Sequence, residues 1–252
     1  DSESEVPLQR WARQEQKAML SLFAQFANPK VLYKSAQVYS ALLDLAASGD
    51  VEIQKSALKA ILAWKNDSIN RYEENLFNML DDARFKEQMS VFLQGDDDSA
   101  LREEDRVQVM PLILRLLYGK VVNRAGSAGG QRSQESRRKA VFIALMRFGI
   151  EDTRQFLYIA LGSLKGVTVM QGNELRESVL QGELLSPRKQ VGLLNMLEDM
   201  LDTLRSQLAP LVSDLMQPIL YCVVRASRAL NANPQTQPSD DNSEKQTSLL
   251  RS

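Results

Sequence analysis

The sequence contains no histidine among its 252 residues, and this absence excludes more than any motif that is present. Without histidine there is no Ser-His-Asp triad, no histidine general base and no histidine metal ligand. The single cysteine, Cys222, excludes an internal disulfide framework and a zinc cluster built on cysteines. It lies in an apolar run, so we expect a buried core thiol. We therefore expect no enzyme, with no catalytic residues, no metal site and no cofactor.

Long apolar runs and a strong net charge are also missing. Apolar residues make up 44% of the chain but occur in short runs, and none reaches the roughly 18 residues of a membrane span. The net charge is −1, whereas a generic polyanion binder is strongly basic. The chain begins at Asp1 without a methionine and stops abruptly at Ser252, so we expect a piece of a longer protein. We expect neither a membrane nor a small-molecule substrate as partner.

What is present is helical periodicity, and it is clearest over residues 39–65. Two apolar faces repeat there with the i, i+3, i+4, i+7 spacing of amphipathic helices. Gly49, in the turn between them, is expected to take a left-handed conformation that ends the first helix, and Asp50 to cap the second. Two antiparallel helices joined by such a turn resemble a HEAT repeat, a unit that buries its faces only against neighbouring pairs. The face-forming residues are Val38, Leu42, Leu45 and Ala46 in the first helix and Ile53, Ala57, Ile61 and Trp64 in the second.

The same periodicity recurs along the chain and predicts an all-α fold, a HEAT-like α-solenoid of about ten helices in antiparallel pairs. No segment shows convincing strand alternation. The predicted domain map is a helical-repeat segment over residues 1–230, a disordered linker at 231–248 and the start of a truncated next helix at 249–252. Flexible loops are expected within the repeat segment near residues 95–105, 123–138 and 166–185.

A basic cluster at one end of the apolar helix expected over residues 107–122 is the main candidate site. Residues 120–139 contain six basic residues and one acid. Such a cluster is suited to phosphate contacts with RNA or to an acidic protein partner, and the alternative is a solvated loop. Both interpretations stay open. The candidate contact residues are Lys120, Arg124, Arg132, Arg137, Arg138 and Lys139.

Other candidate sites favour structural interpretations. Residues 95–105 contain six acids and one base, and a solvated loop is favoured over a site for a cation or a basic ribosomal tail. The glycine-rich segment at residues 126–132 lacks the Gly-Lys-Ser/Thr ending of a phosphate-binding loop, so a loop between helices is favoured. Trp64, Tyr72 and Tyr118 lie on apolar faces and are expected in the core rather than as base-stacking platforms.

Three blocks of sequence carry a more specific resemblance. The first runs from FANPKVLYKS through GDVEIQKSALKAILAWK to RYEENLFNMLDDARFKE, residues 26–87. The second is MPLILRLLYGK at residues 110–120 with RRKAV at 137–141, and the third is PRKQVGLLNMLEDML at 187–201 with PILYCVV at 218–224. In this order the blocks resemble the down-regulated-in-metastasis (DRIM) family, very large HEAT-repeat components of the small-subunit processome.

The resemblance implies a nucleolar scaffold that acts in 18S pre-rRNA processing and small ribosomal subunit assembly. It implies pre-ribosomal proteins, pre-rRNA and small nucleolar RNA as partners within a large ribonucleoprotein, and it carries over no catalytic residues. The alternative is a HEAT-repeat adaptor of another class, such as a nuclear transport receptor or a phosphatase or kinase scaffold.

Overall fold

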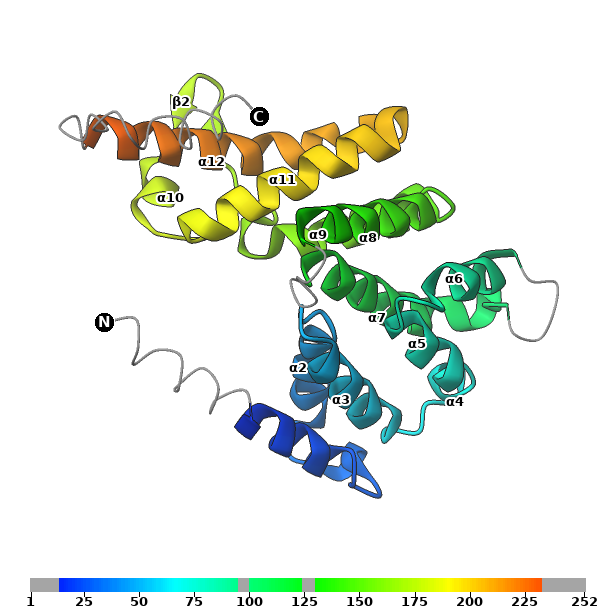
Figure 1. Cartoon of the computed structure of the whole chain (residues 1–252). Helices are drawn as coiled ribbons and strands as arrows, with labels where there is room; N and C mark the ends of the chain where they lie inside the picture. The colour runs from blue at the N-terminus through cyan, green and yellow to red at the C-terminus, as the bar shows by residue number, and fades with distance from the viewer. Residues whose placement is uncertain (1–13, 95–99, 124–129, 233–252) are drawn as a thin grey trace. The chain divides into compact units, whose positions relative to one another are not determined.

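The structure, a computed structural model, describes residues 14–94, 100–123 and 130–232. Helices account for nearly all the regular structure in this described part, and one short hairpin supplies its only strands. The fold is therefore all-α and solenoid-like, which confirms the fold class predicted from apolar periodicity (Figure 1).

The chain divides into two compact units that interleave in sequence. The first comprises residues 1–162 and 192–211, and the second comprises residues 163–191 and 212–252. In chain order, the elements within the first unit are a helix over residues 14–23, η1 (Pro29–Val31), α2 (Ser35–Ala46), α3 (Val51–Leu62), α4 (Asp67–Asn70), α5 (Glu73–Leu80), α6 (Phe85–Gln94), α7 (Glu103–Val122), α8 (Gly130–Leu145), α9 (Ile150–Leu161), most of α11 (Pro187–Leu204) and η3 (Arg205–Leu211).

The predicted helix pair is present as α2 and α3, which lie side by side (Figure 1). The Oδ1 atom of Asp50 accepts the Glu52 backbone N–H at 2.9 Å, so the predicted cap is confirmed. The left-handed conformation expected at Gly49 is wrong, because the positive φ angles of the described glycines fall elsewhere. A Cβ atom at Gly49 would lie 3.1 Å from the Val122 carbonyl oxygen, so the glycine permits close approach to the end of α7.

Helix α7 is the central helix of the first unit. It contacts α2, α3, α4 and α5, which precede it in the chain, and α8 and α9, which follow it (Figure 1). It begins at Glu103, earlier than the expected residue 107, because three acidic residues suit the first turn of a helix. Pro111 is accommodated inside the helix without ending it. Its buried apolar residues surround the helix axis, as expected for a core helix: Val109, Met110, Leu112, Ile113, Leu114, Leu116, Leu117 and Val121.

The closest approach between helices occurs at Gly119 of α7. The side chain of Gln54, fully buried on α3, donates from Nε2 to the carbonyl oxygens of Ala46 at 2.7 Å and Leu116 at 3.2 Å. A Cβ atom on Gly119 would lie 2.2 Å from that nitrogen and 2.4 Å from the Ser48 carbonyl oxygen. One amide therefore joins α2, α3 and α7 at a point where only glycine fits.

Several boundaries differ from the predicted map. Helix α8 begins at Gly130 and covers residues 130–138, which the sequence places in a loop; glutamine, arginine and glutamate in this stretch are good helix formers. Helix α12 (Val212–Ala232) extends just past the expected end of the repeat segment. Residues 95–99 and 124–129, and the linker and next helix predicted beyond 232, lie outside the described residues.

The second unit contains η2 (Gly162–Leu164), a hairpin, α10 (Glu177–Gln181), the start of α11 and α12. The hairpin pairs β1 (Met170–Gln171) with β2 (Glu174–Leu175) in antiparallel register, where a long connection was expected. Gly172 has a φ of 60° in the two-residue Gly-Asn loop, a combination typical of tight hairpins. Strands of two residues are too short to show alternation, which is why the sequence did not reveal them.

Helix α12 is the long helix of the second unit. The stretch Pro187–Asn231, which includes both α11 and α12, contains an 18-residue window that is apolar enough to cross a membrane by length and composition. Of that window, 33% is buried. Core helices of soluble proteins pass the same test, so this is weak evidence for a span. Cys222 is buried, so the predicted core thiol is confirmed. Tyr221 is also buried, whereas Met216 and Val223 are more than half exposed, so the helix has one buried and one exposed face.

We predict that Gly119→Ala destabilises the chain by about 1–3 kcal/mol, because the added methyl group overlaps the Gln54 amide. Gly182→Ala is the matched control, since a Cβ atom there has nothing within 4 Å and the backbone φ is −85°. Urea unfolding followed by circular dichroism measures both. Equal stability of the two variants would contradict the close approach.

Candidate nucleic-acid interface

Lys120, the first residue of the predicted basic cluster, points into the first unit rather than to solvent. It is only 5% exposed, near the C-terminal end of α7. Its ammonium forms an ion pair with the carboxylate of Asp82 and lies 4.9 Å from the centroid of the Phe85 ring. A buried ammonium with a carboxylate and an aromatic face as partners is part of the packing between α6 and α7.

The two adjacent arginines of the cluster are also engaged within the first unit. Arg137 donates to the carbonyl oxygen of Asn123 at 3.2 Å and lies 3.6 Å from Asp82. Arg138 forms an ion pair with Asp199 of α11 at 2.6 Å. Both guanidinium side chains are only 15% exposed, so they join α8 to the end of α7 and to α11. The cluster thus supplies three internal cations.

The other three residues of the basic cluster are Arg124, Arg132 and Lys139. Lys139 is exposed and forms no ion pair within the described part of the chain. Arg132 lies in α8, but its side chain is outside the described residues, as is Arg124 altogether. The structure brings Lys120 and Arg137 together around Asp82 and leaves Lys139 apart from them. Contact of this segment with RNA or with an acidic partner stays a prediction.

The acidic run contributes a buried group that the sequence does not reveal. Asp105 is 3% exposed; it lies 2.6 Å from Nη1 of Arg71 and accepts the Tyr72 hydroxyl at 2.9 Å. The same hydroxyl accepts the backbone N–H of Arg102 at 3.0 Å. Hydrogen bonding from Ser68, then from Tyr72, together with the charge of Arg71, lowers the pKa of the Asp105 carboxyl, although burial opposes this.

The expected solvated loop is therefore wrong for Asp105, which fixes the start of α7 against the segment around Arg71. Glu104 in the same turn is 72% exposed, in keeping with the expectation. Residues 95–99 lie outside the described part, and among the described residues no group of three or more acids or cysteines is placed to hold a metal ion.

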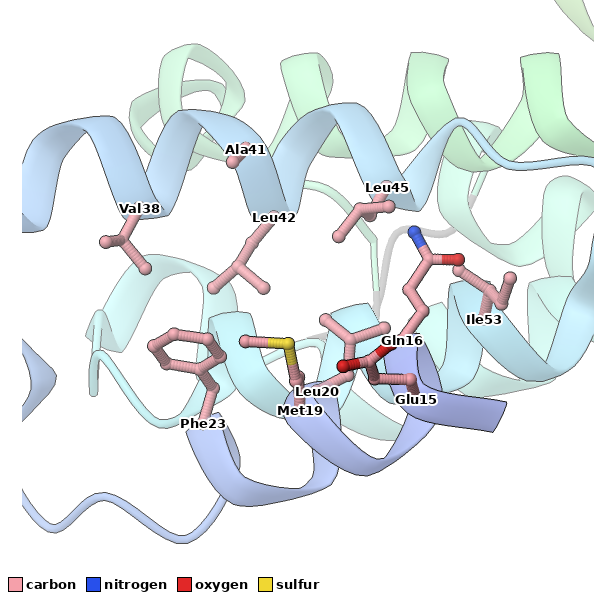
Figure 2. Close-up of a pocket in the computed structure, with 10 residues that line it drawn as sticks. All are labelled: Glu15, Gln16, Met19, Leu20, Phe23, Val38, Ala41, Leu42, Leu45 and Ile53. Carbon is pink, nitrogen blue, oxygen red and sulfur yellow. The ribbon is translucent and has the colours of Figure 1, made fainter. Parts of the chain in front are cut away.

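An apolar groove of about 690 Å³ lies between the helix over residues 14–23 and the α2–α3 pair. Figure 2 shows Met19, Leu20 and Phe23 pointing toward Val38 and Leu42 of α2. Leu20 is buried, whereas Met19 is 56% exposed at the groove. A groove lined in this way accepts apolar side chains rather than a charged substrate.

A second groove, of about 540 Å³, has a different lining. We call it the lysine–aromatic groove; it is formed by Lys30, Tyr39, Trp64, Lys65, Asn66, Asp67, Ser68 and Gln108. Trp64 is 8% exposed and Tyr72 1% exposed, so their predicted core positions are confirmed. This groove was not predicted from the sequence. A Lys-x-x-Tyr-Lys spacing at residues 30–34 was the available signal.

These features describe an all-α, solenoid-like chain whose candidate sites are surface grooves and helix ends. The sequence model of the family described as U3 small nucleolar RNA-associated protein 20, N-terminal, matches residues 10–252, and the chain belongs to this family. This confirms the resemblance seen in the sequence, because DRIM is another name for the same family.

Two curated relatives are similar to most of the chain. U3 small nucleolar RNA-associated protein 20 of Saccharomyces cerevisiae is 29% identical over 221 residues, which cover 88% of this chain and 9% of the relative. The protein of the same name from Schizosaccharomyces pombe is 30% identical over 217 residues, covering 85% of this chain and 9% of the relative. The chain thus spans about a tenth of the length of these relatives.

We predict that Lys120→Ala destabilises the first unit by about 1–3 kcal/mol, because it leaves Asp82 without its buried partner. Lys139→Ala, which removes the same charge from an exposed position, should change stability by less than about 0.5 kcal/mol. Thermal and urea unfolding distinguish the two. A neutral Lys120→Ala variant would mean that this lysine is a surface residue after all.

We predict that Asp105→Asn destabilises the chain by about 1–3 kcal/mol near neutral pH. The folded-state pKa of Asp105 lies below its ordinary value of 3.8, so its contribution is complete above that pH and is lost as the pH falls through the folded pKa. The difference in unfolding free energy between the native chain and the variant should therefore shrink below about pH 3.8. Glu104→Gln is the exposed control; an Asp105→Asn effect independent of pH would refute the ion pair.

Proposed function

We propose that this chain is an interaction segment of a nucleolar HEAT-repeat scaffold that belongs to the small-subunit processome. In that role it acts in 18S pre-rRNA processing and in assembly of the small ribosomal subunit. The observation that carries the proposal is the family match over residues 10–252, a range that includes every helix of the described residues. The two relatives carry U3 small nucleolar RNA association in their names.

The proposed mechanism is binding without catalysis. Consecutive helices bury one face against their neighbours and present the other, which produces extended surface from a modest number of residues. A chain without histidine is consistent with this role, because contact surfaces need shape and charge rather than a proton-transfer group. Support also comes from the burial of Asp105 and Lys120 and from the ion pair between Arg138 and Asp199, since charges used in this way keep the helices in fixed positions.

The proposed partners are pre-ribosomal proteins together with pre-rRNA or small nucleolar RNA. This chain corresponds to about a tenth of its relatives, so each contact it makes is one among many. Linked weak contacts raise the overall affinity through effective concentration, even though each alone dissociates readily. We therefore expect weak binding by this chain alone and stable association only in the longer protein.

The test is to replace residues 14–232 in the full-length protein by an unrelated helical-repeat segment of equal length and to express it as the sole copy. We predict accumulation of unprocessed 18S precursor, unchanged large-subunit rRNA and reduced cosedimentation with pre-ribosomal particles. RNA sequencing after affinity purification of the native protein should show enrichment of pre-rRNA and U3 small nucleolar RNA.

Normal 18S maturation and unchanged sedimentation would overturn the proposal. Copurification with transport cargo or with phosphatase or kinase subunits, in place of pre-ribosomal particles, would instead support an adaptor of another class. The full-length protein with the replaced segment must be as abundant as the native protein. Loss of the whole protein would otherwise produce the same rRNA defect without testing this segment.

A further inference from the structure

The lysine–aromatic groove brings together residues from four parts of the first unit that are far apart in sequence. Lys30 comes from η1, Tyr39 from α2, Trp64 and Lys65 from the turn after α3, and Gln108 from α7. Its volume of about 540 Å³ falls within the range of roughly 300–1,000 Å³ typical of small-molecule sites. The groove therefore has room for a group of nucleotide size.

Its cations are available, in contrast to those of the 120–139 cluster. Lys30 and Lys65 are exposed, as is Lys34 four residues beyond Lys30, and none of the three forms an ion pair within the described residues. One acid, Asp67, also lines the groove, so its lining carries two positive charges against one negative, and Lys34 adds an exposed cation close by in sequence. A chain of net charge −1 thus carries a locally positive concave surface here.

Aromatic side chains accompany these lysines. Tyr33 is 86% exposed, the highest value among the large apolar and aromatic residues exposed in the described chain. The Nζ atom of Lys34 lies 5.4 Å from the Tyr33 ring centroid. Within the groove, the rings of Tyr39 and Trp64 pack 5.5 Å apart, so the wall behind the lysines is rigid and aromatic.

The backbone at the groove is also unusual. Lys34 and Lys65 have φ angles of 56° and 49°, in the left-handed region that favours glycine, and Arg205 is the only other described residue besides glycine with a positive φ. Of these three positions, Lys65 lines the groove and Lys34 follows the groove residue Lys30 by four residues. Glycine would adopt this conformation without strain, so both lysines are held in it by the surrounding structure.

We propose that the lysine–aromatic groove, together with the exposed Tyr33 three residues after Lys30, binds single-stranded RNA. Lys30 and Lys65 contact backbone phosphates, and the exposed face of Tyr33 stacks on a base. The side-chain amide of Asn66 donates to the Gln108 oxygen at 3.4 Å, and its own oxygen accepts the Ser68 backbone N–H at 3.1 Å. The Gln108 side-chain NH2 group is therefore the amide donor that the groove offers to a base edge. An exposed aromatic ring beside unpaired lysines favours RNA over an acidic peptide, which needs cations but no stacking platform.

This inference rests on the proposed function and moves the expected RNA contact away from the 120–139 segment. There, Lys120, Arg137 and Arg138 are engaged by acids of the first unit. Charge neutralisation within the protein therefore makes these three cations poor partners for a phosphate. The lysines of the groove have no such partner, so they are the described cations best placed to exchange counterions for phosphates.

The test uses the whole 252-residue chain and a fluorescein-labelled oligouridylate of about 12 nucleotides, a length on the scale of known single-strand sites. Anisotropy titrations at several salt concentrations yield Kd and its salt dependence. Lys30→Gln/Lys65→Gln should weaken binding and reduce the slope of log Kd against log salt by about 1.4, since each single-strand phosphate contact contributes about 0.7. Arg124→Gln/Lys139→Gln removes the same charge from the 120–139 segment and should leave binding within about twofold.

Stacking is tested separately at Tyr33. Tyr33→Ala should weaken binding by roughly fivefold to a hundredfold, whereas Tyr33→Phe, which keeps the ring, should stay within about twofold of the native chain. Circular dichroism and melting temperature confirm that every variant is folded. Lys30, Tyr33, Lys65 and Lys139 are at exposed positions, so their substitution should leave the stability of the chain close to native.

Three outcomes would overturn the inference. The first is native binding by the groove variant, and the second is equal loss in the Arg124→Gln/Lys139→Gln variant, which would place the contact at the basic cluster. The third is that the chain does not bind RNA, whether or not it binds an acidic polyglutamate peptide through the groove. In that case cosedimentation of the full-length protein with pre-ribosomal particles would still decide the proposed function independently.

Discussion

The approach of α7 to the α2–α3 pair at Gly119 is the constraint on which the first unit depends. Helix α7 contacts the helices before it and the helices after it, so its position determines how both sets are joined. The buried amide of Gln54 reaches carbonyl oxygens on α2 and α7, which it can do only because the backbones meet without an intervening Cβ atom. Hydrophobic burial along α7 supplies the attraction, and this contact supplies the register.

The long amphipathic helices and the cap at Asp50 were predictable because their signals are local. The roles of Asp105 and Lys120 were not, since their partners Arg71 and Asp82 lie 34 and 38 residues away. A run of like charges looks the same in sequence whether it is solvated or paired. For the candidate site, the sequence therefore indicates which segments are charged. Which of those charges face solvent and can contact a partner depends on burial, which the sequence does not show.

The two charged segments that flank α7 have a common structural use. Asp105 lies in its first turn and Lys120 in its last, and each is buried and forms an ion pair with a more exposed partner. An acid at the N-terminus and a base at the C-terminus also complement the helix dipole, so both ends of the central helix are stabilised twice. Recognition of an external polyanion is consequently left to cations that face solvent, and in the described chain the lysine–aromatic groove gathers several of them.

The hairpin in the second unit has a consequence for synthesis. The side-chain amide of Gln217 accepts the backbone N–H groups of Val169 and Met170 and donates to the Met170 carbonyl oxygen, across 48 and 47 residues. A two-stranded ribbon of this size is unstable without such support. As the polypeptide leaves the ribosome, residues 163–191 must wait until α12 has emerged, while the intervening residues 192–211 join helices made earlier. Translation therefore orders the two units, and the first can mature while the second is still incomplete.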